Sequence, residues 1–158
     1  MNTINGLPAH PLLVHIVVVF VPLAALMTVL TVLWPTARRR LGWLTPLFAL
    51  VALIAVPMAT SAGEALEKRV AQTDAVERHT HLGEQMIYWA GPLFALAFLW
   101  WALHEDRVRE YLATRWHAST RTQRIVDLVV GASTLLVAAG AMVTVYRIGD
   151  SGSRAVWQ

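Results

Sequence analysis

Four long runs of apolar residues follow one another along the chain, with short polar segments between them. A helix needs about 20 predominantly apolar residues to cross the hydrocarbon core of a bilayer. Each run has roughly that length, and their only charged or histidine residues are His15 and Asp127. The pattern predicts four membrane-spanning helices, at about 12–34, 44–62, 86–103 and 125–146.

The segments between the runs are short, and short loops join antiparallel neighbours in helical bundles. We therefore expect an all-α protein, an integral membrane four-helix bundle of up-down topology. Residues 1–158 are expected to form a single four-span membrane domain.

Composition supports a membrane protein and excludes several other classes. Hydrophobic residues make up 56% of the chain and charged residues 15%, against about 25% charged in a typical soluble domain. This apolar content excludes a disordered chain. The absence of cysteine excludes disulfide frameworks, thiolate zinc sites and iron–sulfur clusters. The net charge of +3 comes from basic residues that flank apolar runs, so we expect contact with membrane lipid and no nucleic-acid partner.

Basic residues are distributed unequally between the two sides of the predicted membrane. Eight of the 13 Lys and Arg residues fall in the first–second and third–fourth loops: Arg38, Arg39, Arg40, Arg107, Arg109, Arg115, Arg121 and Arg124. By the positive-inside rule these loops are cytoplasmic, and both termini are expected on the extracytoplasmic side.

Most of the unusual polar residues then gather at the outer end of the bundle. They come from the start of the first span, the end of the second, the approach to the third and the exit of the fourth: His10, His15, Gly63, Glu64, Glu67, His79, His81, Arg147, Asp150 and Arg154. Ionisable groups at membrane depth are costly and usually face the bundle interior. This end is therefore where the sequence predicts a site.

Helix geometry favours His15 and His79 as a facing pair. If Pro11 opens the first helix and an Asp74/Glu77 capping box opens the third, each histidine is the fifth residue of its helix. Both then lie about 6 Å below their helix starts, at matched depth.

Three interpretations of this cluster stay open. The histidines and acids are interfacial residues bonded to one another and to water, with no cofactor. Alternatively, His15 and His79 are the axial ligands of a haem b whose propionates pair with Arg147 or Arg154. In the third interpretation, a Zn, Cu or Fe ion is bound by the imidazoles of His10, His15 and His79. Glu64 or Glu67 supplies a carboxylate ligand to the same ion.

Two further features are interpreted as structural. The string Gly149-Asp150-Ser151-Gly152 is expected to end a helix at a Gly149 cap, because it does not match the strand–turn–helix setting of a nucleophilic serine. His104 and His117 are expected to be solvated. No catalytic residue is assigned, and enzymatic activity stays open.

The chain resembles the DUF2231 family of predicted bacterial membrane proteins, especially actinobacterial members. Four pieces carry the resemblance: HPLLVH at 10–15, Gly63-Glu64, ExHxxLG at 77–83 and RIGDSGSR at 147–154. Similar members often have Gly-His-Ser-Gly where this chain has Gly149-Asp150-Ser151-Gly152, which counts against a ligand from the last helix. The resemblance implies a four-helix domain of the bacterial cytoplasmic membrane, sometimes found beside redox modules.

The leading functional hypothesis is a small haem- or metal-binding membrane protein of respiratory electron transfer. The rival is a non-catalytic accessory or assembly subunit of a larger membrane complex. Expected partners are respiratory-chain or other membrane protein subunits, and a homo-oligomer is compatible with the sequence.

Overall fold

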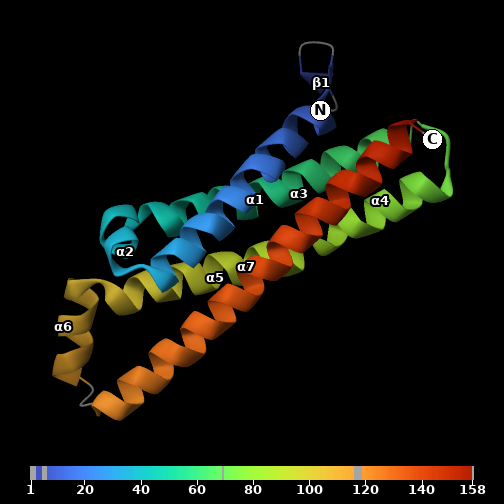
Figure 1. Ribbon diagram of the computed structural model, residues 1–158. Coiled ribbons are helices and arrows are strands. Elements are labelled where there is room, and N and C mark those ends of the chain that lie inside the picture. The colour runs from blue at the N-terminus through green and yellow to red at the C-terminus, as the bar shows by residue number, and fades with distance from the viewer. Residues whose placement is uncertain (1–2, 5–6, 69, 116–118, 158) are drawn as a thin grey trace.

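The computed structural model describes residues 3–4, 7–68, 70–115 and 119–157, and most of them are helical (Figure 1). The elements in chain order are β1 Thr3–Ile4, β2 Leu7–Pro8, α1 Ala9–Leu33, α2 Pro35–Leu41, α3 Leu44–Glu67, α4 Asp74–Gln85, α5 Ile87–His104, α6 Asp106–Arg115 and α7 Thr120–Trp157. The two short strands form an antiparallel hairpin ahead of α1.

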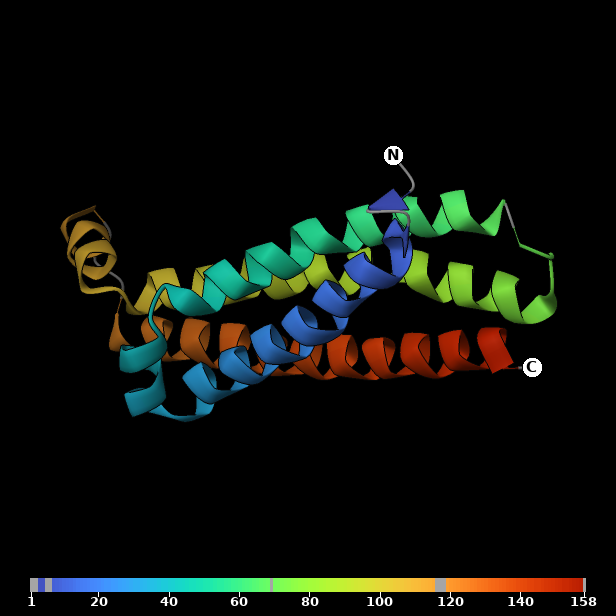
Figure 2. The ribbon, with the colours of Figure 1, turned by 90° about the horizontal axis from the view of Figure 1, so that it is seen from above.

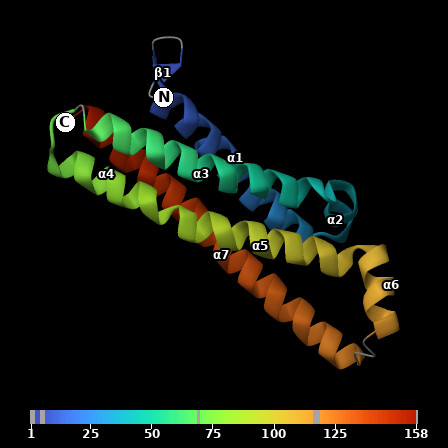
Figure 3. The same cartoon turned by 180° about the vertical axis from the view of Figure 1, so that it is seen from behind.

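The long helices form a closed ring of antiparallel neighbours. Helix α1 packs on α3, α3 on α5, α5 on α7, and α7 closes the ring against α1. Helix α4 precedes α5 across a turn at Met86 and packs along the last part of α7 (Figure 3). The short α6 stands across the opposite end of the bundle, as Figure 2 also shows. The expected all-α, up-down four-helix architecture is confirmed.

Four helical stretches are long and apolar enough to cross a membrane, which makes the chain a multi-pass membrane protein. They are His10–Leu33, Leu44–Glu67, Asp74–His104 and Thr120–Arg154. Each overlaps one of the apolar runs of the sequence and extends beyond it, mostly at the end where α1 begins and α7 ends.

Small residues fill the centre of the bundle, and large apolar residues face outward. Alanines dominate the buried cluster: Ala24, Ala25, Ala49, Ala52, Ala90, Ala97, Ala138 and Ala141. By contrast, Leu128 and Leu136 on α7 are each 73% exposed. Lipid tails are as apolar as leucine, so membrane helices associate through close backbone packing that small residues permit. This arrangement is the one expected of a bundle in lipid.

The starts of α1 and α4 and the end of α7 differ from those expected, and all three affect the site. Helix α1 begins at Ala9, two residues before Pro11. Helix α4 is capped by Thr73, whose hydroxyl accepts the Val76 N–H at 3.3 Å, so Asp74 is the first helical residue rather than the cap.

The expected helix end at Gly149 is wrong, because α7 continues to Trp157. The hydroxyls of Ser151 and Ser153 bond to carbonyls of the preceding turn, those of Ile148 and Asp150, instead of competing with the helix. Packing against α4 supports the additional turns.

Candidate functional site

A cavity of about 450 Å³ opens at the end of the bundle where α1 begins, α3 ends and α4 meets α7. We call this end, which carries His10, His79 and Ser151, the histidine end. The imidazoles of His10, His15 and His79 line the cavity. The lining consists otherwise mainly of apolar side chains and glycines: Pro11, Val14, Val18, Leu66, Val70, Val76, Ile148, Gly63, Gly83, Gly149 and Gly152.

His10 is held by α3. Its Nδ1 lies 2.9 Å from the carbonyl oxygen of Ala59, which can only accept a hydrogen bond, so Nδ1 carries the proton. The ring lies against Gly63, where a Cβ would be 3.0 Å from Cε1 of the imidazole. A neutral His10 therefore keeps the lone pair on Nε2 free.

His79 is held in the same way by α7. Its Nδ1 lies 3.0 Å from the Ser151 hydroxyl, and that hydroxyl donates its own hydrogen to the Ile148 carbonyl at 2.9 Å. With the hydroxyl hydrogen given to Ile148, the hydroxyl oxygen accepts from His79, and this bond assigns the proton to Nδ1 and the lone pair to Nε2. Gly152 makes room for the ring, since a Cβ there would be 3.0 Å from Cε1 of His79.

The two supported imidazoles, one from α1 and one from α4, are neighbours in an edge-on arrangement. The ring centroids of His10 and His79 are 6.3 Å apart and the ring planes are inclined at 78°. The residue opposite His79 is thus His10, where the sequence favoured His15. Because α1 begins at Ala9, His10 lies inside its first turn. His15, five residues further along, is rotated by about 140° around the helix.

His15 occupies the rim of the same cavity. Its side chain is exposed, and its Nδ1 bonds to the Pro11 carbonyl of its own helix. Glu64 is exposed and Glu67 is half-buried, and both contribute to the cavity lining. Within the described part of the chain, no group of three His, Asp or Glu side chains lies close enough to hold a metal ion.

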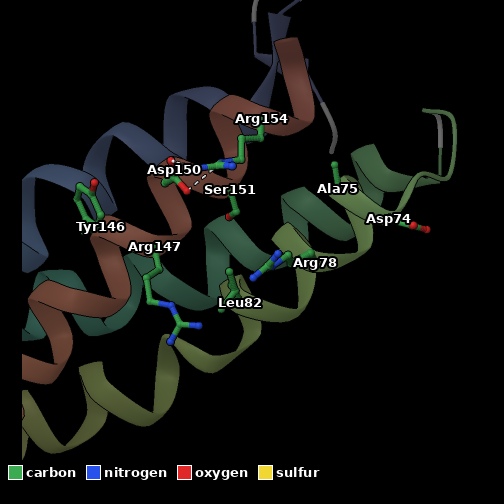
Figure 4. A pocket seen from close by; sticks show the side chains of 9 residues that line it. All are labelled: Asp74, Ala75, Arg78, Leu82, Tyr146, Arg147, Asp150, Ser151 and Arg154. Carbon is green, nitrogen blue, oxygen red and sulfur yellow. Dashed lines mark hydrogen bonds and ion pairs between the residues drawn. The ribbon is translucent and has the colours of Figure 1, made fainter. Parts of the chain in front are cut away.

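Arg147 and Arg154 lie beside a second cavity between α4 and α7, separate from the histidines (Figure 4). Arg154 pairs with Asp150 at 3.1 Å, and the two side chains are 61% and 47% exposed. The clustering of Glu64, Glu67, Arg147, Asp150 and Arg154 at this end of the bundle predicts at least one buried ion pair among them. The Arg154–Asp150 pair exists, but it is exposed rather than buried.

Sequence reasoning missed Ser151 as the partner of His79. The string Gly149-Asp150-Ser151-Gly152 contains this serine, but its glycines favour a helix end, which would leave Ser151 outside the helix. Continuation of α7 past Gly149 turns Ser151, only 7% exposed, toward α4.

A polar cluster at the opposite end of the bundle was also missed. The expectation that His104 is solvated is wrong: its side chain is 8% exposed, bonds through Nδ1 to the Trp100 carbonyl, and lies 3.8 Å from Asp127. Arg38 lies 5.0 Å above the Trp100 ring, and its burial lowers the pKa of the guanidinium. His117 falls outside the described residues.

Comparison with known proteins gives one match. No curated protein and no solved structure shows significant similarity to the chain. One family model matches residues 6–158, which include all four helical spans and both cavities of the histidine end. The chain therefore belongs to the DUF2231 family, described as predicted membrane proteins.

Proposed function

We propose that the cavity at the histidine end binds a b-type haem through His10 and His79, and that the chain transfers electrons in the membrane. The observation that carries this proposal is the pair of opposed imidazoles. In both, Nδ1 bonds to a protein acceptor, and no hydrogen bond of Nε2 is found among the described residues. Histidines that ligate metals characteristically donate their other ring N–H to a backbone carbonyl or to another side chain.

The separation of the two rings suits ligation of one iron. Each imidazole nitrogen lies about 2 Å from a bound metal, so two nitrogens on opposite sides are about 4 Å apart and the ring centroids about 6 Å apart. The observed centroid distance is 6.3 Å. His15 stays outside this pair because its ring lies on the exposed side of α1.

The cavity favours a porphyrin over a hydrated ion. Its volume of about 450 Å³ falls in the range of small-molecule and cofactor pockets, about 300–1,000 Å³. Its lining of valines, leucine, isoleucine and glycine suits an apolar ring, whereas Zn, Cu or Fe ions prefer several N and O ligands. No third His, Asp or Glu side chain of the described residues joins the pair within metal-binding distance.

Two imidazole ligands also define the type of chemistry. A haem held by both His10 and His79 would supply a one-electron redox centre, which suits electron transfer rather than oxygen activation. The chain would hold the iron with His10 and His79 and orient the rings with Ala59 and Ser151. Arg147 and Arg154 line the other cavity, so we do not propose that they pair with the haem propionates.

An absorption spectrum tests this function directly. The full chain, purified in detergent and supplied with haemin, should show a Soret band and, after dithionite, sharpened α and β bands. His10→Ala and His79→Ala should each remove these bands. Ser151→Ala should weaken haem binding by about 10- to 100-fold, because it removes the hydroxyl that accepts the hydrogen bond from His79 Nδ1.

Two matched histidine variants serve as controls. His81→Ala should retain the wild-type spectrum, since His81 is exposed and contacts only Gln85 of its own helix among the described residues. His15→Ala should also retain it. Loss in His15→Ala with retention in His10→Ala would reassign the ligand pair to His15 and His79. A wild-type chain that binds no haemin would overturn the proposal and leave the accessory-subunit role.

A further inference from the structure

A second cavity, of about 400 Å³, lies between α4 and α7 at the histidine end (Figure 4). It shares no lining residue with the histidine cavity. Ser151 forms part of its wall, but the Ser151 hydroxyl is already occupied by His79 and by the Ile148 carbonyl. Any ligand in this second cavity must therefore be recognised by other side chains.

Two guanidinium groups enter this cavity from opposite helices. Arg78 extends from α4 and Arg147 from α7, and Figure 4 shows both side chains reaching into the space between the helices. Neither has an ion-pair or hydrogen-bond partner in the part of the chain that the structure describes.

The carboxylates of the cavity do not neutralise these two cations. Asp150 is paired with Arg154 at 3.1 Å. Asp74 points away from the cavity in Figure 4. Arg78 and Arg147 carry the same charge on opposite walls of the cavity, so an anion bound in it would be attracted by both.

We infer that this cavity binds a phosphate group through Arg78 and Arg147. Guanidinium groups present planar pairs of N–H donors that match phosphate oxygens, and such charge-assisted bonds are among the strongest in proteins. The apolar run of α7 ends at Tyr146, directly before Arg147, so the cavity lies at the depth of lipid headgroups. An anionic phospholipid and free phosphate present the same group to the two arginines.

Thermal unfolding of the delipidated full chain in detergent tests this site. The probes are phosphatidylglycerol in mixed micelles and sodium phosphate, with sodium chloride at equal ionic strength as the reference. At least one probe should raise the melting temperature of the wild-type chain. If both probes raise the melting temperature, the site recognises the phosphate group itself. If only phosphatidylglycerol raises it, the site recognises the lipid headgroup.

The double variant Arg78→Gln/Arg147→Gln should lose the increase, with a reduction in affinity of about tenfold or more for the loss of two charge-assisted contacts. Both side chains are exposed, so far-UV circular dichroism should report an unchanged helical content. Arg124→Gln, which removes an exposed charge from the other end of α7, should retain the full increase. The inference is overturned if neither probe affects the wild type, or if the double variant responds as strongly as the wild type.

Discussion

Replacing Gly140 with alanine should destabilise the bundle, because the indole of Trp89 occupies the place of the missing side chain. A Cβ built on Gly140 would lie 1.9, 2.3 and 2.5 Å from three ring atoms of Trp89. Contacts below 3.0 Å are essentially never seen for real Cβ atoms. The half-buried indole, which packs against the core between α5 and α7, would have to retreat by about 1 Å.

The magnitude follows from two opposing contributions. Overpacking a core costs about 1–3 kcal/mol, and a bulky ring between two helices belongs at the upper end of that range. Alanine recovers about 1 kcal/mol relative to glycine in a helix interior. The net expectation for Gly140→Ala is a loss of about 2 kcal/mol.

Gly91→Ala is the matched control. Gly91 also lies in a spanning helix, but a Cβ there would meet nothing within 4 Å. This variant should gain up to about 1 kcal/mol, so the two alanine variants should differ by about 3 kcal/mol. Reversible SDS titration in mixed micelles, followed by far-UV circular dichroism, measures both free energies of unfolding. Equal stability of the two variants would refute the proposed packing of Trp89 on α7.

Three further predictions address topology, the histidine site and the opposite end of the bundle. A periplasm-active reporter at the C-terminus should be active, because most basic residues lie in the loops of the other side; activity of only a cytoplasm-active reporter would reverse the orientation. Gly152→Ala should lower haem occupancy by crowding the His79 ring, whereas Gly91→Ala, which meets nothing within 4 Å and lies outside the cavity lining, should preserve it; absorption spectra of the two variants distinguish these outcomes. Trp100→Phe should cost about 1 kcal/mol of unfolding free energy in SDS titration, since it removes the indole N–H that donates to the Thr31 carbonyl at 3.2 Å; an unchanged stability would contradict this contribution.

The sequence alone determined the four-helix architecture and the end of the bundle at which His10 and His79 lie. Both follow from features of the linear sequence, namely the lengths of the apolar runs and the positions of the polar residues between them. A bilayer makes such features decisive, because every backbone polar group within it must be satisfied inside a helix or a closed barrel. The approximate positions of His10 and His79 at one end were therefore accessible without coordinates.

Only the tertiary structure decided which histidine faces His79. Successive helical residues are offset by about 100°, so a start at Ala9 rather than Pro11 brings His10 into the helix, about 140° around it from His15. The rotation of α1 against its neighbours then decides which imidazole points inward. Local sequence signals mark a helix boundary only to within one or two residues.

The hydrogen bond between His79 and Ser151 also depends on the tertiary structure. Ser151 reaches His79 because α7 continues past Gly149, and packing against α4 stabilises a stretch that the glycines alone would end. Likewise, Asp127 lies beside His104 only because α7 packs against α5 in the folded bundle, whereas Trp100 is one turn away on the helix of His104 itself. Hydrophobic length is a property of each segment, whereas the rotation of a helix and the partners of its polar groups depend on the neighbours against which it packs.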